Sequence, residues 1–151
     1  MRPSTVIASV FGIGYFPFAS GTVASAVAVP LAIPILIYGG GMALAAASLM
    51  VFAVGVWACG DHVRVTGRED PSECVIDEVA GQWFACAFAS VSLPALALAF
   101  LLFRLFDIWK PWPVGWADRE LPGGLGVMTD DMIAGLMAGV LVALARTLVP
   151  L

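Results

Sequence analysis

Two long stretches of this chain contain no charged residue, and this restricts how they can fold. No Asp, Glu, Lys, Arg or His occurs from Pro3 to Gly60, and a second uncharged run extends from Val79 to Phe103. About 20 apolar residues in a helix cross the roughly 30 Å hydrocarbon layer of a bilayer. Backbone groups inside a bilayer must find hydrogen bonds within the protein, which favours helices. The sequence therefore predicts an all-α integral membrane protein.

The length and charge of the chain narrow this class further. With so many residues in apolar runs, residues 1–151 have room for a single membrane-embedded domain and for no separate soluble one. The first apolar run is longer than a signal peptide, so we expect it to be retained. The net charge of −4 argues against a nucleic-acid partner, which requires a basic surface. Three cysteines without CxxC spacing predict neither a disulfide framework nor a zinc site.

Glycine and proline positions divide the chain into about five helices. A Gly- and Pro-rich loop over residues 12–21 precedes the first helix, and the three glycines at 39–41 are typical of a turn. Ser72, after Asp70-Pro71, is the expected N-cap of the third helix, with Glu73 in its first turn. The expected helices cover approximately residues 22–38, 42–65, 73–92, 95–109 and 129–149.

Pro94 decides how these helices are connected. If 79–103 were one kinked span, the charged residues on its two sides would lie on opposite faces of the membrane. If Pro94 instead begins the second arm of a helical hairpin, both charged segments return to the same face. Each arm is then about 30 Å long or slightly less at 1.5 Å per residue, which is sufficient for a span. We therefore expect a hairpin broken near Pro94.

The hairpin also predicts the orientation of the chain. It places nearly all the basic residues on one side of the membrane and leaves only Arg146 on the other. Positively charged loops face the cytoplasm. We therefore expect a multi-pass protein of the cytoplasmic (inner) membrane whose charged site faces the cytoplasm.

All eleven carboxylates lie in two windows, residues 61–78 and 104–131. Asp77 and Glu78 directly precede an apolar run, where ionisable residues are costly and usually functional. Carboxylate oxygens near a membrane surface are suitable ligands for Mg²⁺, which keeps several waters and takes substrate phosphate oxygens. Glu73 lies four residues before Asp77, on the same face of the expected helix. A solvated first turn explains Glu73 equally well.

Arg104, Asp107 and Lys110 repeat every three residues and form one stripe on the expected fourth helix. A carboxylate between two cations can hold a metal ion while the cations contact phosphate oxygens. The alternative is a structural ladder of ion pairs, with the lysine reaching toward the headgroups. Further along, Asp130 and Asp131 follow a glycine-rich segment at an expected helix start, where one acid alone would be read as a cap.

The remaining polar residues favour a mechanism that uses metal and water. His62 is the only histidine, and a lone histidine at a helix end is more often structural than catalytic. No cysteine is followed six residues later by the arginine that cysteine-dependent phosphatases require. Neither a histidine pair nor a cysteine nucleophile is therefore expected.

Four strings spread over nearly the whole chain carry a family resemblance. They are GIGYFPFASGTVAS, VIDEVAGQW, FRLFDIWKPWPVGWADRE and GGLGVMTDDMIAG. They resemble the phosphatidylglycerophosphatase A family, a group of all-helical, Mg²⁺-dependent membrane lipid phosphatases. The resemblance implies hydrolysis of phosphatidylglycerol phosphate to phosphatidylglycerol and inorganic phosphate, a step in phospholipid biosynthesis. The first string departs from the family at Ser20, where the family usually has proline.

The resemblance also implies a set of site residues. The implied metal ligands for Mg²⁺ come from Asp77, Glu78, Asp107, Asp130 and Asp131. The implied catalytic residues are Asp77, Glu78, Arg104, Lys110 and Asp131. The implied substrate contacts are Thr22, Arg104, Lys110 and Asp118. The resemblance does not divide the roles among the acids.

Two other functions compete with this one. A lipid alcohol phosphotransferase also uses acids and divalent metal at the membrane surface, but its DGxxAR…GxxxDxxxD pattern does not occur here. A small ion carrier would place ionisable residues at mid-membrane, whereas every acid here lies at a segment end. The expected partners are a phospholipid substrate and the membrane; headgroup selectivity and oligomeric state stay open.

Overall fold

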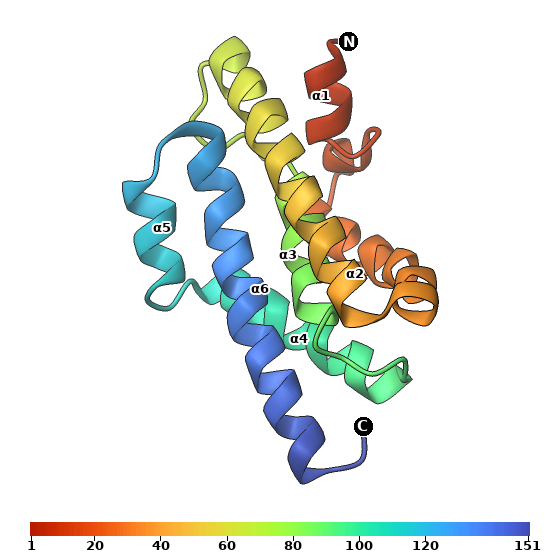
Figure 1. Ribbon diagram of the computed structural model, residues 1–151. Coiled ribbons are helices and arrows are strands. Elements are labelled where there is room, and N and C mark those ends of the chain that lie inside the picture. The colour runs from red at the N-terminus through yellow and green to blue at the C-terminus, as the bar shows by residue number, and fades with distance from the viewer.

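The structure is a computed structural model that describes residues 1–151, and it is all-helical, as expected (Figure 1). Its elements are α1 (Pro3–Ala8), the 3-10 turn η1 (Ile13–Tyr15), α2 (Ser20–Thr66), α3 (Ile76–Cys86), α4 (Leu93–Trp109), α5 (Val114–Glu120) and α6 (Gly123–Leu148). Two of these helices, α2 and α6, are long and apolar enough to cross a membrane.

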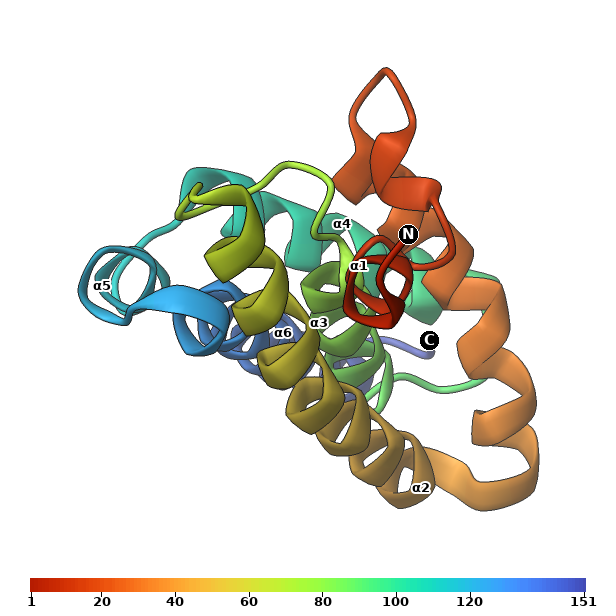
Figure 2. The same cartoon turned by 90° about the horizontal axis from the view of Figure 1, so that it is seen from above.

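Helix α2 consists of two arms that meet at Gly40, as Figure 2 shows from above. Gly40 has φ 72° and ψ −175°, a conformation that residues with a Cβ rarely adopt. The neighbouring Gly41 packs against the connection between α3 and α4, because a Cβ there would lie 2.2 Å from the Ala87 carbonyl oxygen. The turn predicted from the triple glycine is confirmed, and the arms match the first two expected helices.

Pro94 begins a helix and does not kink one. It lies in the first turn of α4, where proline needs no amide hydrogen bond, and the Ser92 hydroxyl caps this turn by accepting from the Ala95 amide at 3.3 Å. The hairpin near Pro94 is therefore confirmed. Its first arm is shorter than expected, since α3 ends at Cys86 and not at Ser92.

The expected start of the third helix was wrong. Helix α3 begins at Ile76, so Ser72 is not its N-cap and Glu73 is not in its first turn. The preceding residues bond to the N-terminal segment instead: the Val75 amide donates to the Ala8 carbonyl at 2.9 Å, and the Ser20 hydroxyl donates to the Ser72 carbonyl at 3.2 Å. These long-range bonds hold the segment before α3 in a non-helical path.

The expected start of the last helix was also wrong, because α6 begins at Gly123 and not near Thr129 or Asp130. Glycine disfavours an isolated helix, but here it allows close packing. A Cβ on Gly124 would lie 2.3 Å from the Val56 carbonyl oxygen of α2. The short helices α1 and α5 were not expected. The chain has six α-helices because the first two expected helices are the two arms of α2.

Helix α3 lies between α2 and α6 at the centre of the bundle (Figure 1). Gly81 of α3 and Gly135 of α6 bring these two helices into backbone contact, since a Cβ on Gly135 would lie 2.3 Å from the Gly81 carbonyl oxygen. Asp77 and Asp131 each lie four residues, or about one helical turn, before these glycines. The glycine contact therefore places the two aspartates opposite each other.

Candidate active site

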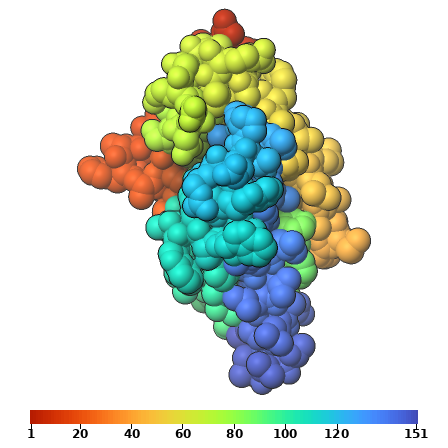
Figure 3. Space-filling view, turned by 90° about the vertical axis from the view of Figure 1, so that its left-hand side faces the viewer, coloured from red at the N-terminus to blue at the C-terminus, as the bar shows by residue number.

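Both charged windows of the sequence border a single cleft of about 900 Å³. Its walls come from the loop before α2, residues 69–72 with Cys74, the start of α3, the end of α4, the end of α5 and the first turns of α6. In Figure 3 the N-terminal loop, the segment around residue 70 and the region from α5 to α6 surround a recess on this face. The common site expected from the hairpin is thus present in the structure.

The deepest polar group in the cleft is a cluster of three acids. Asp77, Glu78 and Asp131 each offer a carboxylate oxygen, and these oxygens lie within 4.8 Å of one another. Asp77 is 8% exposed and Asp131 only 2%. Glu78 Oε2 and Asp131 Oδ2 are buried without a hydrogen-bond partner in the protein. Buried, mutually repelling carboxylates with free oxygens fit a divalent cation well.

Arg104 and Asp107 lie beside this cluster on the last turns of α4. Arg104 donates to Asp107 in an i,i+3 ion pair, and both side chains are largely buried. Arg104 and Asp107 line the same cleft as Asp131. The Nε of Arg104 has no partner in the protein. The pair therefore connects the acid cluster to a guanidinium that retains a free donor.

Lys110 is held at the opposite wall by two acids. It ends α4 with a left-handed φ of 54°, and its Nζ donates to Asp118 at 2.7 Å and to Asp130 at 3.0 Å. Partial burial alone would lower the pKa of Lys110, but the hydrogen bonds and charges of Asp118 and Asp130 raise it above its usual value. Lys110 is therefore a permanent cation at neutral pH.

The first turn of α2 closes the cleft against Glu78. A Cβ on Gly21 would lie 2.2 Å from Glu78 Oε1 and 3.5 Å from Arg104 Nη2, so only glycine lets the backbone approach the acid cluster this closely. Thr22 follows and lines the same cleft. Gly21 lies within the string GIGYFPFASGTVAS but was not predicted as a site residue.

The structure brings all nine predicted site residues to this cleft. They are Thr22, Asp77, Glu78, Arg104, Asp107, Lys110, Asp118, Asp130 and Asp131. Their settings differ from the expectation in two respects. Asp130 and Asp131 lie in the interior of α6 and not at its start. Lys110 leaves the expected stripe with Asp107 and pairs across the cleft.

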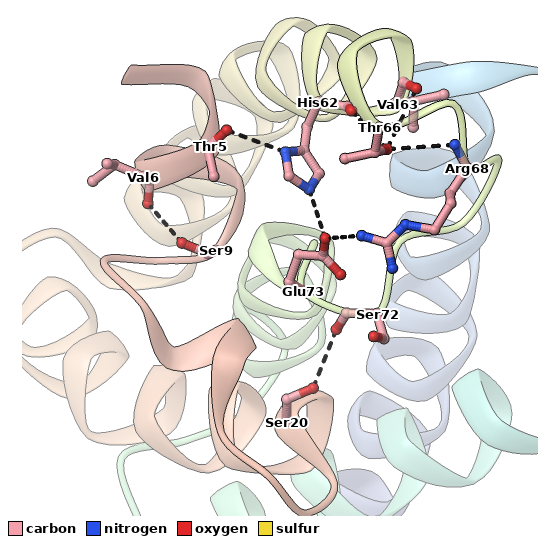
Figure 4. A network of polar contacts seen from close by, with 10 residues as sticks. All are labelled: Thr5, Val6, Ser9, Ser20, His62, Val63, Thr66, Arg68, Ser72 and Glu73. Atoms are coloured by element: carbon pink, nitrogen blue, oxygen red, sulfur yellow. Dashed lines mark hydrogen bonds and ion pairs between the residues drawn. The ribbon is translucent and has the colours of Figure 1, made fainter. Parts of the chain in front are cut away.

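Glu73 belongs to a second polar network, drawn in Figure 4. Its Oε1 lies 3.0 Å from His62 Nε2 and accepts from Arg68, and His62 Nδ1 lies 3.2 Å from the Thr5 hydroxyl. Burial acts to raise the pKa of Glu73, but the hydrogen bonds from His62, its own backbone and Arg68 lower it below its usual value. His62 does not line the cleft and takes part in this network instead. The network ties α1, the end of α2 and the segment before α3 together.

The fold and the cleft together define the class of the protein. It is a helical bundle in which a cluster of acids and two cations converge on one cleft, and the two cations can bind the oxygens of a phosphate group. The chain matches the model of the family Phosphatidylglycerophosphatase A over residues 6–146. It belongs to this family, whose members hydrolyse a phosphate monoester.

Curated relatives agree with this assignment. Phosphatidylglycerophosphatase A of Escherichia coli is 34% identical over 93% of this chain and 82% of its own length. The enzyme of the same name from Haemophilus influenzae is 32% identical over 94% of this chain and 88% of its own length. A Bacteroides thetaiotaomicron protein, provisionally described as a phosphatidylinositol-3-phosphatase, is 35% identical over 96% of both chains. No solved structure matches the chain.

Proposed function

We propose that this protein is a Mg²⁺-dependent membrane phosphatase that hydrolyses phosphatidylglycerol phosphate to phosphatidylglycerol and inorganic phosphate. Membership of the family supports the activity. The observation that carries the metal dependence is the cluster of Asp77, Glu78 and Asp131, with two buried oxygens that no protein donor satisfies.

Asp77, Glu78 and Asp131 would hold the metal ion, and Asp107 would hold Arg104 in place through their ion pair. The ion, when bound, supplies Lewis-acid polarisation of the phosphoryl group. Arg104 and Lys110 bind the phosphate oxygens from two sides of the cleft, Arg104 through its free donors and Lys110 as a point charge. Both cations stabilise the charge that spreads over these oxygens in a loose transition state.

Asp130 is a further buried acid next to the cluster, and we propose that it activates the attacking water. Its Oδ1 accepts the Asp131 amide at 2.9 Å and its Oδ2 accepts from Lys110, so the carboxylate is firmly oriented. Asp130 accepts a proton as the water oxygen attacks phosphorus. The bond between phosphorus and the glycerol oxygen breaks, and that oxygen takes the proton. The products are phosphatidylglycerol and inorganic phosphate.

We also propose that the protein lies in the inner membrane with the cleft at its cytoplasmic face, and the surface of the molecule supports the place in a membrane. Large apolar side chains are exposed along the helices, including Leu31, Ile37, Met50 and Leu101. Exposed aromatic side chains gather near the cleft, and tryptophans of this kind mark the interface of a bilayer. They are Phe16, Phe18, Trp109, Trp112 and Trp116.

Phosphate release by the purified protein in detergent tests the proposal. We expect release from phosphatidylglycerol phosphate that stops with a chelator and returns with Mg²⁺. Release that is unchanged by chelation would remove the metal from the mechanism. A phosphotransferase would instead need a nucleotide-linked lipid and release CMP, and an ion carrier would produce flux without phosphate release.

The Bacteroides relative supports a second candidate substrate, phosphatidylinositol 3-phosphate, because it is as similar to this chain as the phosphatidylglycerophosphatases are. Both lipids carry a phosphate monoester on a polyol headgroup, and the cleft contacts described here address only the phosphate. The ratio of kcat/KM for the two lipids decides between them. We expect the ratio to favour phosphatidylglycerol phosphate, and a ratio that favours the inositol lipid would reassign the substrate.

A further inference from the structure

A second, apolar groove of about 290 Å³ lies between the first arm of α2 and α4. Seven of its eight lining residues are hydrophobic. Leu96 forms part of its wall and is 5% exposed, whereas Ala26 and Ala97 are exposed and leave space because their side chains are small. The lining residues are Ala26, Val29, Pro30, Ile33, Leu93, Leu96, Ala97 and Phe100.

The groove continues from the polar cleft along both helices. On α2, Thr22 lines the cleft, and the groove begins four residues later at Ala26 and ends at Ile33. On α4, Arg104 lines the cleft, and the groove begins four residues earlier at Phe100. Four residues make about one helical turn, or roughly 6 Å. On both helices, therefore, a polar residue of the cleft is followed one turn further from the cleft by the apolar residues of the groove. The chain runs away from the cleft on α2 and toward it on α4.

We propose that this groove binds an acyl chain of the phospholipid substrate while the phosphate lies in the cleft. The proposal rests on the function proposed above. In a glycerophospholipid the acyl chains and the phosphate share a glycerol unit, so an acyl site has to begin close to the phosphate site. The groove begins about one turn from Thr22 and Arg104 and extends away from them.

The geometry favours one chain of one bound lipid over general contact with the bilayer. Other exposed apolar residues, such as Leu31 and Leu101, do not line this groove. At the seam of α2 and α4, apolar residues of two helices enclose a groove that begins one helical turn from residues of the cleft. An acyl chain bound in this groove would help to orient the phosphate in the cleft. Binding of the acyl chain should therefore raise kcat/KM.

Substrates that differ only in chain length test this inference. We would measure kcat/KM for dipalmitoyl and dihexanoyl phosphatidylglycerol phosphate in the same detergent, for the wild type and for Ala97→Phe. The added ring fills the groove, so the ratio of the long-chain to the short-chain value should fall about tenfold or more. Ala26→Phe fills the groove from the opposite wall and should have the same effect if Ala97→Phe does not fold.

Ala46→Phe is the matched control, because Ala46 is an exposed alanine on the other arm of α2 and does not line the groove. Its ratio should stay within about twofold of the wild type. An unchanged ratio in both groove variants would overturn the acyl site and leave the phosphatase intact. Absence of phosphate release from either lipid by the wild type would overturn the proposed function, and the acyl site with it.

Discussion

At the scale of single residues, the site is built from buried carboxylates, two of which keep an oxygen without a hydrogen-bond partner in the protein. Asp131 keeps one oxygen free of any protein donor although the residue is 2% exposed. Desolvating such a group is costly unless a charge of opposite sign is supplied. Arg104 and Lys110 do not reach these free oxygens, since each is paired with other acids. The unpaired oxygens therefore support the proposal that the cluster binds a cation from solution.

Glu78→Gln should weaken metal binding and activity together. The substitution keeps the shape of the side chain but removes one negative charge from the cluster. We expect Mg²⁺ affinity, measured calorimetrically, and kcat/KM for phosphate release each to fall roughly 10–100-fold. Asp61→Asn is the control, because Asp61 lies outside the cleft and pairs with Ser4, Arg2 and Arg64. Equal losses in both variants would contradict a specific role of Glu78.

Gly21→Ala should disturb the site without unfolding the protein. The new methyl group would lie 2.2 Å from Glu78 Oε1, and a flexible carboxylate can move away more easily than backbone. We expect a near-normal melting temperature. The curve of phosphate release against Mg²⁺ concentration should shift about tenfold to higher Mg²⁺ concentration. Gly60→Ala has room for its methyl group, with its nearest neighbour at 3.9 Å, and should leave this curve unchanged. A normal curve for Gly21→Ala would show that Glu78 does not need its present position.

At this scale the sequence identified residues better than it identified their partners. The acids and cations of the cleft could be predicted because charges are rare in this chain and lie within distinctive strings. Their pairing could not, since Lys110 bonds to Asp130 across 20 positions and His62 bonds to Glu73 from another element. Spacing along one helix gives no information about such contacts. Glu73 was misplaced for this reason.

At the scale of elements, close contacts between glycines set the positions of the helices. Gly81 and Gly135 allow α3 and α6 to touch through their backbones, one turn from Asp77 and Asp131. Small residues permit this kind of approach between helices in a membrane. The geometry of the acid cluster is thus a consequence of helix packing.

Gly135→Ala should therefore destabilise the protein and also weaken the metal site. Its Cβ would lie 2.3 Å from the Gly81 carbonyl oxygen, and backbone cannot yield without separating the helices. We expect the free energy of unfolding in detergent to fall by roughly 1–3 kcal/mol, with a parallel loss of Mg²⁺ affinity. Gly60→Ala serves again as the control for an alanine in a helix. Unchanged stability would mean that the helices have room to adjust.

The network around Glu73 predicts a pH dependence of stability. The pKa of this carboxyl is lowered in the folded protein, so its contribution to stability is fully present above the unfolded pKa of about 4.3 and is lost as pH falls through the folded value. Thermal unfolding below about pH 4.3 should show this loss. Glu73→Gln should flatten that part of the curve. A wild-type curve with the same slope as the variant would contradict the role of Glu73.

Helix boundaries were predictable where local chemistry determines them and not elsewhere. Gly40 and Pro94 each restrict the backbone directly, and the turn and the hairpin followed from them. The starts of α3 and α6 are set by contacts with distant segments: Val75 bonds to Ala8, and Gly124 packs against Val56. Local propensity cannot reveal such contacts. The short helices α1 and α5 were missed because each has too few residues for a periodic pattern.

At the scale of the whole molecule, the polar cleft and the uncharged turns lie at opposite ends of the bundle. The turn at Gly40 packs against the connection from α3 to α4, and Arg146 near the C-terminus donates to the Phe88 carbonyl in the same region at 2.8 Å. Residues 69–72 and 118–123 border the cleft. If the bundle spans a membrane, these two ends face different compartments.

Single cysteines at the two ends test this orientation. Glu69, Glu120 and Tyr38 are all exposed, and the three native cysteines are buried and can be replaced by alanine. In intact cells, a membrane-impermeant maleimide should label Tyr38→Cys and should label Glu69→Cys and Glu120→Cys only after the membrane is permeabilised. The reason is that the cleft, with most of the basic residues, should face the cytoplasm. If Glu69→Cys and Glu120→Cys were labelled from opposite sides of the membrane, the shared cleft itself would be contradicted. If both were labelled from outside, only the proposed orientation of the protein in the membrane would be reversed.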